Sequence, residues 1–157
     1  MLKLKEVVMY KKVVVPLDGS ELAECSLDEV MNVIGEGSEL LLIRAMEPVS
    51  GMAYAEVPPE ILEQAEKKNV DASKRYLDKV AGRLKKKGIR VQTEVVWGNP
   101  ADEIIAFAKK NNADLIMITT HGRSGVSRWA LGSVADKVLR MARIPVLMVI
   151  PAACRVG

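Results

Sequence analysis

Short apolar runs alternate along this chain with longer stretches in which apolar residues recur at helical spacing. Val13, Val14 and Val15 form a continuous β-branched run, which predicts a buried strand. Further strands are predicted at 39–45, 89–97, 113–118 and 146–150, and helices at 21–34, 59–87, 100–108 and 133–143. Strands separated by helices make right-handed crossovers. The alternation therefore predicts a single α/β domain, a doubly wound parallel sheet with helices on both faces.

Capping residues and glycines mark the ends of the predicted helices. Ser20 is placed to cap the first helix, and Asn99 with Pro100 is a typical start for the third. The apolar spacing of the first helix continues to Ile34, and Gly35 is expected to stop it.

Composition excludes several classes of function. The 157 residues carry a formal net charge of only +3, and 4% of them are aromatic. A nucleic-acid-binding domain would need a basic stripe with stacking aromatics, and neither is evident. Cys25 and Cys154 lie far apart and belong to no CxxC pair, which disfavours a structural zinc site or a disulfide framework. With no membrane-length apolar run and no signal-peptide pattern, we expect a cytoplasmic protein that has neither a membrane nor a nucleic acid as partner.

The strongest chemical signal lies between the fourth predicted strand and the fourth predicted helix. Residues 119–125 read Thr-Thr-His-Gly-Arg-Ser-Gly, and Gly132 and Ser133 follow. Glycines let backbone N–H groups approach a phosphate, and a helix N-terminus adds unpaired donors and partial positive charge. This segment predicts a phosphate cradle to which Arg123 and Arg128 add charge. The structural alternative is that the glycines only shape a turn and Ser133 only caps a helix.

Two other strand ends are candidates for the rest of the site. In doubly wound sheets, ligands bind beyond the carboxyl ends of the strands, where the strand order reverses. Asp18 follows the first strand and could reach a ribose hydroxyl or an adenine amine; alternatively it closes an Asx turn. Ala45 ends the second strand and could offer backbone groups to a base, or it belongs to the core.

The residues predict no catalytic group and no resident metal. His121 is the single histidine. It could form a catalytic triad with Asp18 and either Ser124 or Ser133, but the chain lacks the Gly-x-Ser-x-Gly motif of such hydrolases. No His, Cys and carboxylate cluster has the spacing of a metal site. A Mg²⁺ ion would enter only with the phosphates of a nucleotide.

From about residue 10 to residue 150, the sequence resembles the universal stress protein family. The resemblance rests on segments 10–20 (YKKVVVPLDGS), 120–125 (THGRSG), 131–138 (LGSVADKV) and 144–149 (IPVLMV). It implies a five-stranded parallel sheet of order 3-2-1-4-5, homodimerisation and, in one branch, binding of ATP or a related adenine nucleotide. It also implies a nucleotide-binding domain at 10–151, with residues 1–9 as an N-terminal extension and 152–157 as a C-terminal tail.

The nucleotide-binding branch carries the pattern G-2x-G-9x-G-(S/T). Gly122, Gly132 and Ser133 match its last three fixed positions, whereas Thr119 stands at its first glycine. The aspartate and the second-strand base contact of that branch match Asp18 and Ala45. The resemblance thus implies a cofactor-binding site for ATP or AMP made of Pro16, Asp18, Ala45, Thr119, His121, Gly122, Arg123, Gly125, Gly132, Ser133 and Val134.

The implied strand order places segment 146–150 at an edge of the sheet. All of its residues, from Val146 to Ile150, are apolar, and an exposed apolar edge favours pairing with another copy. Our interpretation is a homodimeric stress-response or signalling module that binds an adenine nucleotide. Two alternatives stay open: a dimeric interaction module of the same fold that binds no nucleotide, which Thr119 favours, and a slow ATP hydrolase.

Overall fold

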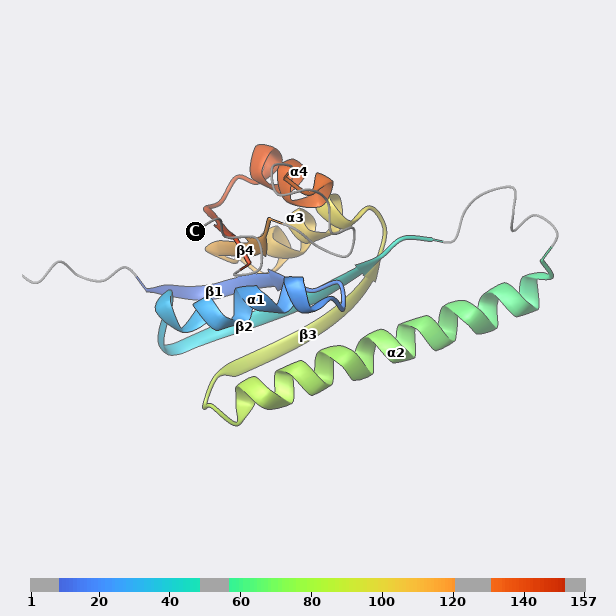
Figure 1. Ribbon diagram of the computed structural model, residues 1–157, viewed down its shortest axis with the longest axis horizontal. Helices are drawn as coiled ribbons and strands as arrows, with labels where there is room; N and C mark the ends of the chain where they lie inside the picture. Colours follow the sequence, from blue (N-terminus) through green and yellow to red (C-terminus); the bar gives the residue numbers. More distant parts are fainter. Residues whose placement is uncertain (1–8, 49–56, 121–130, 152–157) are drawn as a thin grey trace, which may run out of the picture.

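The computed structural model describes residues 9–48, 57–120 and 131–151, which form one sheet with helices against both of its faces (Figure 1). The strand order is β3-β2-β1-β4-β5, and every strand pair is parallel. The predicted fold class and strand order are therefore confirmed. In chain order the elements are β1 (Tyr10–Pro16), α1 (Glu21–Glu29), a 3-10 turn (Val30–Asn32), β2 (Ile34–Met46), α2 (Pro59–Lys85), β3 (Arg90–Trp97), α3 (Pro100–Lys110), β4 (Leu115–Thr119), α4 (Ser133–Met141) and β5 (Val146–Val149).

Each face of the sheet has its own apolar layer. Val13 and Val15 pack in the layer that includes α1 and α2, whereas Val14 packs in the layer that includes α3 and α4. Successive residues of a strand point to opposite faces, so a strand covered on both sides must be apolar at every position. The continuous β-branched run of β1 is the consequence.

The first helix ends earlier than its apolar spacing predicts. α1 stops at Glu29, and Ile34 is the first residue of β2, where it pairs with Tyr10 of β1. The Tyr10 N–H donates to the carbonyl of Val33 at 2.9 Å, and the Ser38 hydroxyl donates to the carbonyl of Tyr10 at 2.7 Å. These contacts with β1 draw the segment into the sheet, so the predicted helix over 21–34 is wrong at its C-terminal end.

A half-buried carboxylate joins the start of β1 to the start of β4. The two oxygens of Asp114 accept hydrogen bonds from the backbone N–H groups of Lys11 and Lys12, at 2.9 and 3.0 Å. The Asp114 N–H donates in return to the carbonyl of Lys12 at 3.0 Å. The contact fixes the register of two strands that are about a hundred residues apart in the chain.

Only the C-terminal half of α2 packs on the sheet. Its buried residues begin at Ser73 and end at Leu84, and the N-terminal half extends away from the sheet (Figure 1). Where the helix meets the sheet, the guanidinium of Arg44 lies 5.5 Å from the centroid of the Tyr76 ring. The Tyr76 hydroxyl is enclosed and lacks a hydrogen-bond partner among the described residues. Its burial, and then the nearby Glu24 carboxylate, raise the pKa of Tyr76 above its ordinary value.

No helix in the described part of the chain has the length and apolar character needed to span a membrane.

Asp114→Ala is predicted to lower the free energy of unfolding by about 1–3 kcal/mol, because two backbone N–H groups lose a charged acceptor. Asp114→Asn keeps one acceptor oxygen and should lose less. Urea unfolding measures both changes, with Asp71→Ala on the exposed part of α2 as the control that should stay within about 0.5 kcal/mol of wild type. Equal losses for Asp114→Ala and the control would contradict the role given to this contact.

The free energy of unfolding is predicted to fall above about pH 10. Tyr76 keeps its proton to higher pH in the folded chain than in the unfolded chain, where it ionises near 10.0. Its stabilising contribution is therefore complete below that pH and is lost as the pH rises. Tyr76→Phe keeps the ring but cannot ionise, so its unfolding free energy should decline less steeply. Urea titrations at about pH 8, 10 and 11 test this difference; parallel declines would refute it.

Candidate functional site

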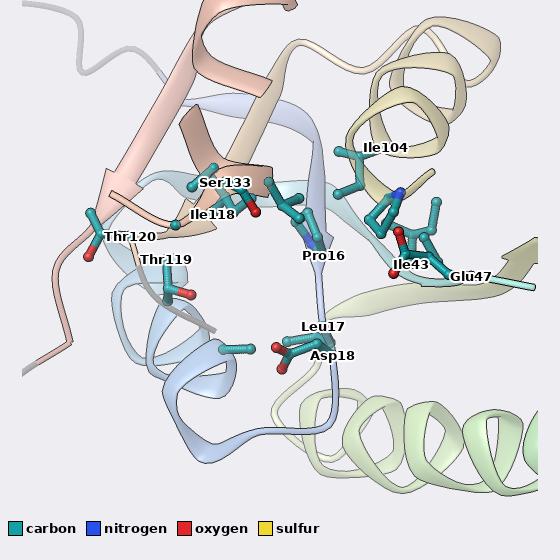
Figure 2. Close-up of a pocket in the computed structure, with 16 residues that line it drawn as sticks. Pro16, Leu17, Asp18, Ile43, Glu47, Ile104, Ile118, Thr119, Thr120 and Ser133 are labelled. Carbon is teal, nitrogen blue, oxygen red and sulfur yellow. The ribbon is translucent and has the colours of Figure 1, made fainter. Parts of the chain in front are cut away.

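A pocket of about 370 Å³ lies at the carboxyl edge of the sheet, where β1 and β4 adjoin (Figure 2). Its walls come from the ends of β1, β2 and β4, the loop after β1, and the first turns of α3 and α4. From β1 the chain moves outward through β2 to β3, and then returns to place β4 and β5 on the other side of β1. Pockets form at such a reversal because the loops on its two sides leave in opposite directions.

One wall of the pocket is the N-terminus of α4. Gly132 is the N-cap, and as a glycine it has no side chain with which to cap this helix. The Gly132 N–H donates to the carbonyl of Thr120 at 2.8 Å, which ties the start of the helix to the end of β4. The first turn of α4 lines the pocket with Ser133, Val134 and Ala135. In its first turn a helix supplies no acceptors for its own N–H groups. This wall can therefore donate backbone hydrogen bonds to an anion.

Helices α1 and α3 begin differently from α4, because a side chain caps each of them. In α1 the Ser20 hydroxyl accepts from the N–H of Ala23 at 3.1 Å, and in α3 the Asn99 side chain accepts from the N–H of Asp102 at 3.4 Å. Both caps were predicted from the sequence. The Lys137 ammonium also binds the Asp102 carboxylate at 2.8 Å, and thereby holds the first turns of α3 and α4 together.

Asp18 closes a turn after β1 and also lines the pocket. Its Oδ1 accepts hydrogen bonds from the N–H and the hydroxyl of Ser20, at 2.9 and 2.6 Å, so it does close an Asx-type turn. It also lines the pocket, below Pro16 in Figure 2. Gly19 provides the positive φ of +87° that this turn requires.

The wall away from α4 is mainly apolar. Ile43, Ala45 and Ile104 line it, and Figure 2 shows Ile43 and Ile104 on the side of the pocket opposite Thr120. Pro100 at the start of α3 completes this wall. Flat, apolar ligand groups such as an aromatic base would match it.

Seven of the residues implied by the resemblance line the pocket: Pro16, Asp18, Ala45, Thr119, Gly132, Ser133 and Val134. Ser133 is the first residue of α4, directly after the N-cap. Thr119 is buried at the end of β4, where it pairs with Val149. The other implied residues, His121, Gly122, Arg123 and Gly125, lie outside the described residues.

Glu47, Pro100 and Ile104 also line the pocket, although none of them was among the predicted site residues. A usable signal existed, because the carboxyl ends of all parallel strands meet at one edge. Glu47 directly follows β2, and Pro100 follows β3 by a short turn. Like Asp18 after β1, both residues follow the carboxyl end of a strand and are therefore neighbours of the pocket.

The charges around the pocket are unevenly placed. Asp18 and Glu47 are the only charged side chains among the described residues that line it, and both are acids. Within the described part of the chain, then, donors for an anion come from the N-terminus of α4 and from the hydroxyl side chains near it. No group of three or more metal-ligating side chains is found in this part of the chain.

Comparison with known proteins agrees with this architecture. The universal stress protein family model matches residues 9–149. Universal stress protein MJ0531 of Methanocaldococcus jannaschii is 35% identical over 144 residues, which cover 90% of this chain and 82% of that protein. The solved structure of protein MJ0577 of the same organism superposes with a TM-score of 0.80 at 28% identity, covering 91% of this chain and 97% of that one.

Two more distant solved structures share the fold and contain nucleotides. One is a universal stress protein in complex with cAMP, with a TM-score of 0.65, 24% identity, and coverage of 92% of this chain and 99% of that one. The other is the universal stress protein from Archaeoglobus fulgidus in complex with dAMP, with a TM-score of 0.59, 22% identity, and coverage of 89% and 98%. With the family model matching nearly its whole length, the chain belongs to the universal stress protein family.

Proposed function

We propose that the chain binds an adenine nucleotide, ATP or AMP, in the pocket between β1 and β4 and acts as a stress-response or signalling module. The observation that carries the proposal is the N-terminus of α4, which lines the pocket and has a glycine at its N-cap position. Its backbone donors and partial positive charge suit a phosphate group. The cAMP and dAMP found in two structures of the same fold support this ligand class.

The charge distribution supports one orientation of the nucleotide. Phosphate would lie at Ser133 and Val134, because Asp18 and Glu47 would repel it from the rest of the pocket. The nucleoside would then lie toward these carboxylates, which accept hydrogen bonds from hydroxyl and amino groups. Ile43 and Ile104 would contact the faces of the base.

A pocket of about 370 Å³ falls within the size range of small-molecule sites. Mg²⁺ would be held chiefly by the nucleotide's own phosphates, which is the usual mode for this ion. The proposal assigns no catalytic residue to the chain, and any hydrolysis of ATP would be slow.

We also propose that the chain forms a homodimer through β5. This strand is at an edge of the sheet, and among the described residues it pairs only with β4. Leu147 on the strand is 36% exposed and Ile150 after it is 50% exposed; Leu139 and Met141 of the preceding helix are also exposed. A two-fold copy of the strand would satisfy the free backbone edge and cover apolar surface.

Freshly purified protein is predicted to release an adenine nucleotide that mass spectrometry can identify, or to bind ATP or AMP saturably in calorimetric titrations with and without Mg²⁺. Gly132→Val should weaken binding roughly tenfold or more, because its side chain would stand between the phosphate and the donors of α4. Gly82→Ala is the matched control, since a Cβ at Gly82 meets nothing within 4 Å. Absence of binding at millimolar nucleotide would refute this function and leave the interaction module.

Leu147→Lys is predicted to convert the dimer to monomer, because two added charges would face each other across the two-fold axis. Light scattering coupled to size-exclusion chromatography measures the mass. Trp97→Lys is the matched control: Trp97 is 38% exposed on the opposite edge strand, β3, and its replacement should leave the mass unchanged. A Leu147→Lys protein with wild-type mass would contradict pairing through β5.

A further inference from the structure

We infer that Arg44 is a positioning residue for the nucleotide site, which holds the turn carrying Asp18 in the place where its carboxylate meets the ligand. Arg44 is not one of the residues that line the pocket. The inference rests on the proposed function and extends it to a residue on the other face of the sheet.

The guanidinium of Arg44 lies directly against this turn. A Cβ built on Gly19 would be 2.9 Å from its Nη1 and 3.5 Å from its Cζ. The guanidinium therefore occupies the space that a side chain at position 19 would need. Ser20 fixes the Asp18 carboxylate within the turn, and Arg44 limits movement of the turn's backbone from outside.

Helix α2 holds Arg44 in place from the other side. The Tyr76 ring lies 5.5 Å from the guanidinium carbon, at a distance typical of a cation–π contact. Two residues farther along β2, Met46 accepts a hydrogen bond at its sulfur from the Ser73 hydroxyl, 3.4 Å away. The guanidinium thus lies between an aromatic ring and the turn, and its flat shape suits both surfaces.

Arg44 and Asp18 both act on the ionisation of Tyr76. Burial and the Glu24 carboxylate have the largest effects on the pKa of Tyr76, and both raise it. Asp18 adds a smaller upward effect and Arg44 a downward one. The contact of Arg44 with the Tyr76 ring and its position against Gly19 thus join α2, β2 and the turn beside the pocket.

A double-mutant cycle separates positioning of Asp18 from general stabilisation. AMP affinity is measured by calorimetry for wild type, Arg44→Met, Asp18→Asn and the double variant, at a temperature where melting curves show all four folded. Each single change should weaken AMP binding roughly three- to tenfold. If Arg44 acts through Asp18, the double variant should bind within about twofold of Asp18→Asn.

Two further variants sharpen the cycle. Arg44→Lys keeps the charge but loses the flat guanidinium, so its affinity should lie between those of wild type and Arg44→Met; it also replaces Arg44→Met in the cycle if that variant does not fold. Arg75→Met removes an exposed arginine next to Tyr76 in the sequence and should bind AMP like wild type.

The outcomes distinguish the inference from the function on which it rests. If wild type binds neither AMP nor ATP, both fall. If wild type binds AMP but Arg44→Met binds equally well, the positioning role is refuted and the nucleotide site stands. Action through Asp18 is also refuted if Arg44→Met weakens AMP binding by the same factor in wild type and in the Asp18→Asn variant. It is likewise refuted if Asp18→Asn alone does not change AMP affinity.

Discussion

Burial of both faces of the parallel sheet is the constraint on which the rest of the structure depends. Val13, Val14 and Val15 are fully buried, and in the described part of the chain α1 and α2 cover one face while α3 and α4 cover the other. With both faces covered, polar side chains that must reach solvent or a ligand are confined to the edges. The carboxyl edge also receives the first turns of α3 and α4, so its chemistry combines strand ends with helix N-termini.

The helix N-termini at this edge differ in capping: α1 and α3 have a side-chain cap, whereas α4 has a glycine at its N-cap. Ser20 and Asn99 satisfy donors of α1 and α3 from within the chain. Gly132 offers α4 no side-chain acceptor, at a cost of only a few tenths of a kcal/mol relative to a better cap. A small loss of helix stability therefore leaves the donors of one helix directed at the pocket, and Lys137 keeps that helix aligned with α3.

Sequence patterns predicted what depends on local order and missed what depends on distant contacts. The apolar runs and caps gave the strands, the helix starts and the strand-end position of Asp18, because periodicity and capping are local properties. The end of α1 was wrong because pairing of Ile34 with Tyr10 outweighs helical spacing. The guanidinium of Arg44, a residue of β2, lies against Gly19 in the turn after β1, and no spacing rule predicts which side chain will cover a turn.

The carboxylates of Asp18 and Glu47 would influence the orientation of an anionic ligand in the pocket through their charge as well as through direct contacts. A phosphate charge about 6 Å from either carboxylate would be disfavoured by about 1–3 kcal/mol at an effective dielectric constant of about 80 to 20. The same charge at the N-terminus of α4 would gain from the helix dipole. Arg44, which lies behind the turn, supplies positive charge near Asp18 without entering the pocket. In the proposed binding mode, Arg44 would support the turn from outside the pocket, Asp18 would face the nucleoside, and the phosphate would lie at the N-terminus of α4.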